Sequence, residues 1–185
     1  MKFFLLGILT TLLLIALGTF VYLHFGFLRF NADEQPSALE SKLAMSAVDA
    51  FLERRAPAAN SAPQSSDADL LEGMKLYTAN CAVCHGDPGQ PERVMGKSFY
   101  PPVPQFMNDP ADMPARHNFY IIKHGIRWTG MPAWGSSLND AQIWTLTAFL
   151  AQMDKLPPAV DQEWKKGAST TTKDESSGTM KPMTR

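Results

Sequence analysis

The sequence predicts a protein built of helices. Three observations support this: a long apolar run at the N-terminus, an amphipathic segment over residues 37–55, and three shorter segments with helix-capping residues between residues 67 and 153. The stretches between them are rich in proline, glycine, alanine and serine, which favour turns and linkers. At 185 residues, the chain has room for about one domain with appendages.

The N-terminal apolar run extends from Phe3 to Leu28 without a charged residue. A helix of about 26 residues is roughly 39 Å long, which is enough to cross a bilayer core of about 30 Å with some tilt. A cleaved signal peptide would have an apolar region of about 7–15 residues followed by a small-residue cleavage site. This run is longer, and Val21–Phe25 offers no such site. We therefore expect residues 1–30 to form an uncleaved transmembrane anchor.

The segments that flank the central domain are expected to be a stalk and a tail. Within residues 31–66, Ser37 can cap a helix that ends near Arg55, and a linker follows. The apolar face of this helix can rest on the globular domain or on the membrane surface, or it can dock a partner subunit. Residues 157–185 are predicted to be disordered, because the chain after Lys166 has almost no apolar residues besides methionines.

The balanced charge of the chain predicts that it does not bind nucleic acid. The chain has 17 Lys and Arg residues against 18 Asp and Glu residues, which gives a formal net charge of −1. No segment forms a polybasic arm. The chemistry of the chain must therefore be sought in its local motifs.

The two cysteines of the chain lie in one pentapeptide, Cys81-Ala-Val-Cys84-His85. This C-x-x-C-H spacing is typical of covalent attachment of a c-type haem. The two thiols can add to the haem vinyl groups, and His85 follows directly, so that its imidazole can be the proximal iron ligand. A redox dithiol, a disulfide and half of a zinc site are the alternatives. The remaining histidines do not supply a second ligand pair for zinc, and the helical flanks do not suit a thioredoxin-like site.

Three helices are predicted around this motif, within a domain of residues 67–156. They cover Asp67 to Asn80, residues 114–124 and residues 140–153. Asp112 is a candidate cap for the second helix, and Gly125 can end it. Asn139 and Gln142 can form a capping box for the third. Gly73 in the first helix leaves room for a large ring from the third, either Trp144 or Phe149.

A second axial ligand is expected from the loop before the third helix, Gly130-Met131-Pro132-Ala-Trp-Gly. A thioether is a soft donor that suits haem iron opposite a histidine. Pro132 stiffens the loop, and Gly130 lets the backbone come close. Methionine is more often core filler than a ligand. The competing methionines are Met74, Met95, Met107, Met113 and Met153.

The imidazole of His85 needs a hydrogen-bond acceptor for its Nδ1–H group, which orients the ring. The segment Tyr100–Pro104 follows the motif, and the carbonyl of Pro102 or Pro104 is the expected acceptor. Three residues are candidates for haem propionate contacts and equally for ordinary packing: Tyr100, Arg127 and Trp128. His117 and His124 are expected to face solvent.

Taken together, these motifs resemble a monohaem class I cytochrome c over about residues 69–156. The resemblance is carried by four motifs: Gly73-x-x-x-Tyr77, Cys81–Gly86, Tyr-Pro-Pro-x-Pro at 100–104, and Gly-Ile-Arg-Trp-Thr-Gly-Met-Pro-Ala-Trp at 125–134. It implies an all-α fold with a class I cytochrome c domain. It also implies one covalent haem c, bound through Cys81 and Cys84, with His85 and Met131 as axial ligands of the iron.

The expected function is one-electron transfer, because His/Met ligation leaves no open coordination position for a substrate. Haem attachment through cysteine takes place on the outer face of a bacterial inner membrane. We therefore expect a single-pass protein of the bacterial inner (cytoplasmic) membrane, with its haem domain on the periplasmic side and a role in a respiratory chain. Its partners would be redox proteins: a quinol-oxidising complex, a dehydrogenase or a terminal oxidase. The alternatives are a permanently bound haem subunit of a membrane oxidase or dehydrogenase complex, and a haem peroxidase or gas sensor.

Overall fold

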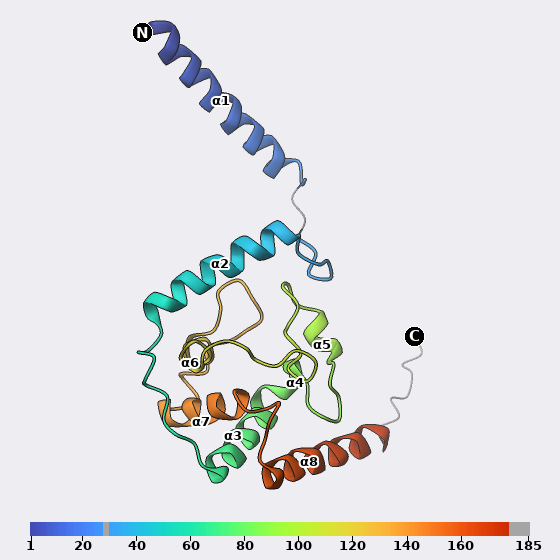
Figure 1. Ribbon diagram of the computed structural model, residues 1–185. Helices are drawn as coiled ribbons and strands as arrows, with labels where there is room; N and C mark the ends of the chain where they lie inside the picture. The colour runs from blue at the N-terminus through green and yellow to red at the C-terminus, as the bar shows by residue number, and fades with distance from the viewer. Residues whose placement is uncertain (28–29, 178–185) are drawn as a thin grey trace. The chain divides into compact units, whose positions relative to one another are not determined.

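All regular elements of the described chain are α-helices, as predicted (Figure 1). The computed structural model describes residues 1–27 and 30–177. It divides into two compact units, Met1–Asn31 and Ala32–Arg185. The first unit contains helix α1, and the second contains the remaining helices and both cysteines.

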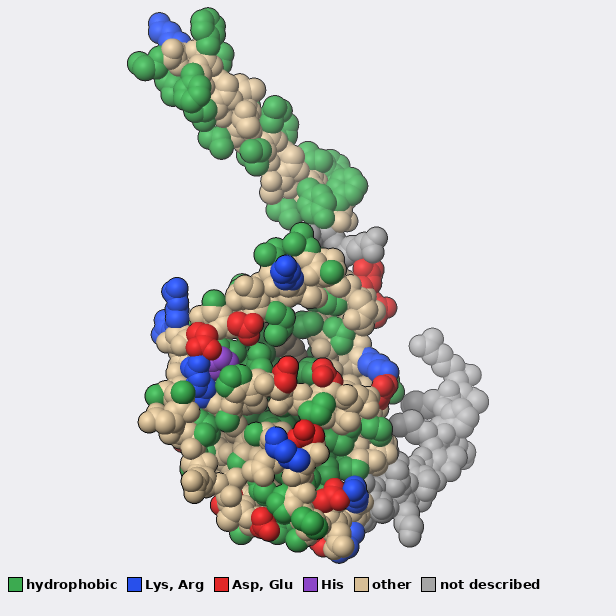
Figure 2. Space-filling model, viewed as in Figure 1, with side chains coloured by type: hydrophobic (Ala, Val, Ile, Leu, Met, Phe, Trp, Pro, Cys, Tyr) green, Lys and Arg blue, Asp and Glu red, His purple; other side chains and the backbone are tan. Residues whose placement is uncertain are grey.

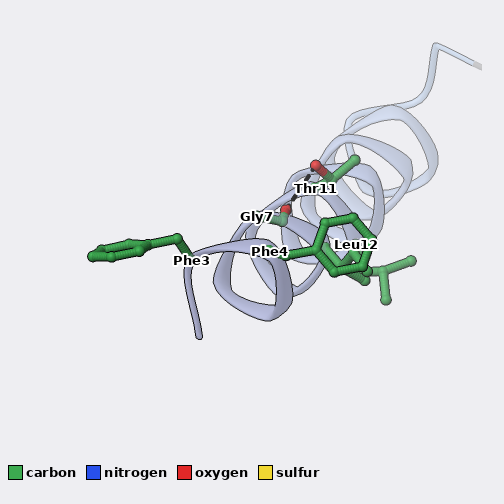
Figure 3. Close-up of a pocket in the computed structure, with 6 residues that line it drawn as sticks. Phe3, Phe4, Gly7, Thr11 and Leu12 are labelled. Carbon is green, nitrogen blue, oxygen red and sulfur yellow. Dashed lines mark hydrogen bonds between the residues drawn. The ribbon is translucent and has the colours of Figure 1, made fainter. Parts of the chain in front are cut away.

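Helix α1, Lys2–His24, has 23 residues and is apolar on all sides. At 1.5 Å per residue it is roughly 35 Å long, and it is long and apolar enough to cross a membrane. Figure 3 shows a shallow depression on its surface, lined by Phe3, Phe4, Gly7, Ile8, Thr11 and Leu12. The Thr11 hydroxyl donates a hydrogen bond to the Gly7 carbonyl at 2.9 Å, so this polar group is satisfied within the helix. Such a helix suits lipid, which supplies no hydrogen-bond partners.

Helix α2, Ala38–Arg55, begins at the predicted cap, where the Ser37 hydroxyl accepts a hydrogen bond from the Glu40 amide. Near its C-terminal end it packs against the second unit's core. Leu52 is buried, and the Phe51 ring meets the Tyr120 ring edge-on, with centroids 5.8 Å apart. This end of the helix therefore rests on the globular domain, one of the arrangements that the sequence allowed.

The core of the second unit is built on three longer helices: α3 (Asp67–Asn80), α6 (Ala115–His124) and α7 (Asp140–Leu150). Ser66 and Asp69 form a capping box at the start of α3, and Asn139 and Gln142 form the predicted one at the start of α7. Pro114 occupies the N-cap of α6, which has no side-chain cap, so Asp112 does not fill that role.

Helices α3 and α7 make their closest approach at Gly73. A Cβ atom added there would lie 2.4 Å from the Thr145 carbonyl oxygen and 2.8 Å from the Phe149 Cβ. Backbone atoms cannot move aside as a flexible side chain can, so this crossing requires glycine. Of the two rings that the sequence offered as neighbours of Gly73, Phe149 is the one that lies there. Trp144 instead stacks on Phe119, with ring centroids 4.2 Å apart.

The prediction of a disordered tail over residues 157–185 is wrong for most of that segment. Pro158–Ser177 forms helix α8, and Val160 and Trp164 are buried. The Trp164 ring meets the rings of Tyr77 and Phe149 edge-on, with centroid distances of 5.7 and 5.3 Å. Proline is tolerated in the first turn of a helix, so Pro158 begins α8. Residues 178–185, also part of that prediction, lie outside the described residues.

Candidate haem-binding site

The C-x-x-C-H motif forms a single helical turn directly after α3. Cys81 is the C-cap of α3, and α4 follows over Ala82–His85. The amides of Cys84 and His85 donate hydrogen bonds to the Cys81 carbonyl at 3.0 and 2.9 Å. These bonds hold the two cysteines and the histidine in one rigid arrangement.

The Cys81 thiol is buried in the hydrophobic core, whereas Cys84 is partly exposed. Burial, assisted by the neighbouring Cys84, raises the pKa of the Cys81 thiol to about 12. The thiolate is the reactive form of cysteine, so the folded chain presents an unreactive thiol at this position.

The His85 imidazole is oriented from one side by the segment that the sequence indicated. Its Nδ1 lies 2.9 Å from the Pro104 carbonyl oxygen. A carbonyl can only accept, so Nδ1 carries the proton and Nε2 has the lone pair that a metal ligand needs. Burial lowers the pKa of His85, against a smaller raising effect of the Pro104 hydrogen bond, which favours the neutral ring. The prediction of a proline carbonyl acceptor is confirmed, with Pro104 in that role.

These residues fit a covalently bound c-type haem. Two cysteines and a neutral histidine with an available Nε2 are its attachment set. The start of the motif also lies in apolar surroundings, because Cys81 and Ala82 belong to the hydrophobic core. Several partly buried apolar side chains pack against the core cluster that contains Cys81 and Ala82: Met74, Leu76, Phe106, Met107, Ala111, Met131, Trp134, Trp144 and Leu156.

The loop that carries Met131 is pinned to the C-terminal end of α6. Two backbone hydrogen bonds join it to α6: Trp134 N to Ile122 O and Gly135 N to Lys123 O, both at 3.0 Å. A third, Ile126 N to Met131 O at 3.2 Å, lies within the loop. Gly125 has a φ of 68°, and a Cβ atom there would lie 2.7 Å from the Met131 carbonyl oxygen. The loop is therefore rigid, as a ligand loop must be. Its methionine as the iron ligand stays a prediction.

Of the three candidates for propionate contacts, Tyr100 bonds another part of the chain, whereas Arg127 and Trp128 contact each other. The Tyr100 hydroxyl donates to the Glu40 carboxylate of α2 at 2.5 Å. Arg127 and Trp128 do form a pair, with the guanidinium 5.9 Å from the indole ring centroid. Trp128 is 90% exposed, and its φ of 61° is in the left-handed region that bulky residues rarely adopt.

Sequence reasoning missed a polar link between α2 and α6. Arg116 donates to the Glu53 carboxylate at 2.5 Å, and the His117 Nε2 lies 3.3 Å from the same carboxylate. The hydrogen bond from Arg116 is the largest of the effects that lower the pKa of Glu53. His117 is only 4% exposed, so the prediction that it faces solvent is wrong. No local pattern marks a pair that is separated by more than 60 residues.

Tyr77 supports the motif from the side of α3. Its ring is fully buried, and its hydroxyl donates a hydrogen bond to the Gly86 carbonyl at 2.7 Å. Burial raises the pKa of Tyr77 well above its ordinary value, so the hydroxyl remains a donor. The bond ties the chain just beyond His85 to α3.

Replacing Tyr77 with phenylalanine should lower the free energy of unfolding by about 1–2 kcal/mol, because the buried Gly86 carbonyl loses its side-chain donor. Denaturant unfolding followed by circular dichroism measures this change. The matched control is Tyr120→Phe, at a partly exposed tyrosine, where a change within about 0.5 kcal/mol is expected. Equal effects at the two positions would contradict a specific role for the Tyr77 hydroxyl.

The chain is similar to several known proteins. Residues 68–150 match the family model described as cytochrome c oxidase, cbb3-type, subunit III. A thiosulfate dehydrogenase of Stutzerimonas stutzeri is 28% identical over 138 residues, which are 68% of this chain and 44% of that protein. The cbb3-type cytochrome c oxidase subunit FixPc of Rhizobium leguminosarum is 35% identical over 46% of this chain and 28% of that protein. A cytochrome c6 of Synechococcus is 31% identical over 45% of this chain and 69% of that protein. The match thus spans less than half the length of the first two relatives.

Proposed function

This chain belongs to the monohaem class I cytochrome c family, and on that premise we propose that it is a one-electron carrier with His85 and Met131 as axial ligands. The haem, when bound, supplies a one-electron Fe(III)/Fe(II) couple. The observation that carries the proposal is the pair of rigid supports for the two ligands. Pro104 orients His85, and three backbone hydrogen bonds hold the Met131 loop. With both axial positions of the iron filled by protein ligands, no coordination position is left for a substrate, as an electron carrier requires.

The other residues of the site retain and shield the cofactor. Cys81 and Cys84 hold it covalently, and the parallel ring of Phe106, with its centroid 4.5 Å from that of His85, keeps water from one face of the imidazole. Val83, between the two cysteines, is exposed. We therefore place electron exchange at the surface beside the cysteines, where a partner protein can approach the attachment site.

A second candidate function is an enzymatic one, because two relatives are named thiosulfate dehydrogenase. Haem peroxidase and gas-sensing roles belong to the same class, since each needs an open or labile sixth position. The carrier proposal expects purified full-length protein to be reduced and reoxidised reversibly and to bind carbon monoxide slowly or not at all. It also expects no thiosulfate-dependent reduction of ferricyanide. Thiosulfate turnover or rapid carbon monoxide binding would favour the enzymatic candidate.

We propose that α1 anchors the protein in a bacterial inner membrane, with the haem domain in the periplasm. The length and apolar surface of α1 support an anchor, although a signal sequence can share both properties. Sidedness follows from the chemistry, because covalent haem attachment takes place outside the cytoplasm. The partners would then be redox proteins at the membrane surface, such as a quinol-oxidising complex, a dehydrogenase or a terminal oxidase.

Full-length protein should stay with membranes that are washed with carbonate or high salt. Burial of an apolar helix is not reversed by screening charges. Immunoblots of the pellet and supernatant measure the distribution. The matched control replaces residues 1–31 with a cleavable signal peptide, and this chain should appear in the soluble periplasmic fraction. Native protein that is soluble, with an N-terminus beyond residue 20, would contradict the anchor.

The reach of the haem domain from the membrane bears on whether the protein is a mobile shuttle or a fixed subunit. Because α2 packs on the domain, the connection from α1 is the 13 residues from Phe25 to Ser37. Fully extended, these span at most about 45 Å. This reach suits a redox partner in the same membrane. Purification in mild detergent separates the cases, because a fixed subunit co-purifies with its complex and a shuttle does not.

A further inference from the structure

We propose that Gln105 is a positioning residue for the proximal ligand, and that its side-chain amide sets the hydrogen bond that tunes His85. The inference rests on His85 as the proximal ligand, which is part of the proposed function. Gln105 does not touch the imidazole. It acts through the two residues on either side of it in the chain.

The Gln105 amide connects three separate pieces of backbone. Its Nε2 donates to the Cys84 carbonyl and to the Val103 carbonyl, both at 2.9 Å. Its Oε1 accepts a hydrogen bond from the Arg93 amide at 2.7 Å. Both N–H groups of the amide are thus used, and its oxygen has a partner. This set of bonds fastens the segment around Gln105 directly to the haem-attachment turn.

Both chain neighbours of Gln105 contact His85. The Pro104 carbonyl accepts the His85 Nδ1–H at 2.9 Å. The Phe106 amide donates to the His85 carbonyl at 3.1 Å, and the Phe106 ring lies parallel to the imidazole with an interplanar angle of 1°. Any displacement of Gln105 relative to Cys84 would therefore change the distance from Pro104 to His85.

The surroundings hold the Gln105 amide in this one position. A Cβ atom on Gly96 would lie 2.5 Å from the Gln105 Nε2 and 2.6 Å from the Cys84 carbonyl oxygen, so the backbone of α5 (Val94–Lys97) closes over the amide. The backbone amide of Arg93 donates to the Gln105 side chain, as described above. The Arg93 guanidinium forms an ion pair with Asp87 at 2.6 Å, and both of these side chains are largely buried. The hydrogen bonds of the Gln105 amide are therefore formed within a well-packed loop.

The expected effect is on the reduction potential. A short Nδ1–H···O=C bond makes the imidazole a more basic ligand, which stabilises Fe(III) and lowers the potential. Without the Gln105 amide, Pro104 is no longer fastened to the attachment turn, and this bond weakens. The potential should then rise.

The test compares the midpoint potentials of full-length holoprotein variants by spectroelectrochemistry. Gln105→Met keeps the length of the side chain and removes all three amide bonds, so its potential should lie above that of the parent. The matched control is Gln152→Met, which removes an amide that donates to Ser65. Its potential should equal that of the parent, even if both variants lose stability. Gln105→Leu, a second uncharged variant without the amide, should also raise the potential.

An unchanged potential in Gln105→Met would overturn the proposal, since a purely structural residue would lower stability alone. If both Gln105 variants fail to retain a native haem while Gln152→Met retains it, Gln105 serves folding and the proposal is also wrong. His85→Gly is measured alongside. Loss of the low-spin spectrum in that variant confirms His85 as a ligand, so that failure at Gln105 is distinguished from failure of the proposed function.

Discussion

Replacing Met131 with alanine should lower the midpoint potential by on the order of 0.2 V, within the range of about 0.8 V that axial ligands set across haem proteins. Water or a nearby side chain would take the sixth position, and a harder ligand stabilises Fe(III). The weak far-red charge-transfer band that the family shows for sulfur-ligated Fe(III) should disappear. The variant should also bind carbon monoxide or gain peroxidase activity. Spectroelectrochemistry and optical spectra of the holoprotein measure these changes.

Two further variants make this test specific. Met95→Ala removes a methionine that is 53% exposed on α5, and it should keep both the band and the parent potential. Met131→His should restore six-coordination without restoring the potential. If Met131→Ala keeps the band and the potential, another methionine is the ligand, with Met107 or Met113 the next candidates. The pinned loop would then have a structural role only.

Replacing Trp164 with alanine should lower the free energy of unfolding by about 3–5 kcal/mol, as for other large buried aromatic residues. The ring is 6% exposed and contacts both Tyr77 and Phe149, so its loss leaves a cavity against the α3–α7 crossing. Denaturant unfolding of the holoprotein, followed by far-ultraviolet circular dichroism, measures the change. A decrease in the midpoint of thermal unfolding should accompany it.

Trp128→Ala is the matched control for Trp164→Ala, because it removes the same side chain from a position that is 90% exposed. The free energy of unfolding should change by less than about 0.5 kcal/mol. Alanine keeps the cost of the positive φ at this position, so no gain from relief of strain is expected. If Trp164→Ala were as mild as Trp128→Ala, α8 would contribute little to the stability of the domain.

The sequence by itself determined the features that depend on local chemistry. The C-x-x-C-H spacing predicts the haem, and family membership agrees with it. The capping box at Asn139 and Gln142 forms as predicted, because its bonds join residues only three apart. Gly73 indicated that another element comes close, since glycine alone lacks the side chain that would prevent it, although the partner on α7 is distant in sequence.

Only the tertiary structure decided the features that depend on distant partners. Val160 and Trp164 lie in a polar segment that looks disordered, and a surface on α3 and α7 is what orders it. Glu53 meets His117, and Gln105 meets Cys84, across separations that no pattern in the chain records. Burial of an apolar ring or pairing of a polar group requires a partner at a particular place in space. Local sequence sets the candidates for such contacts, and the packed fold selects among them.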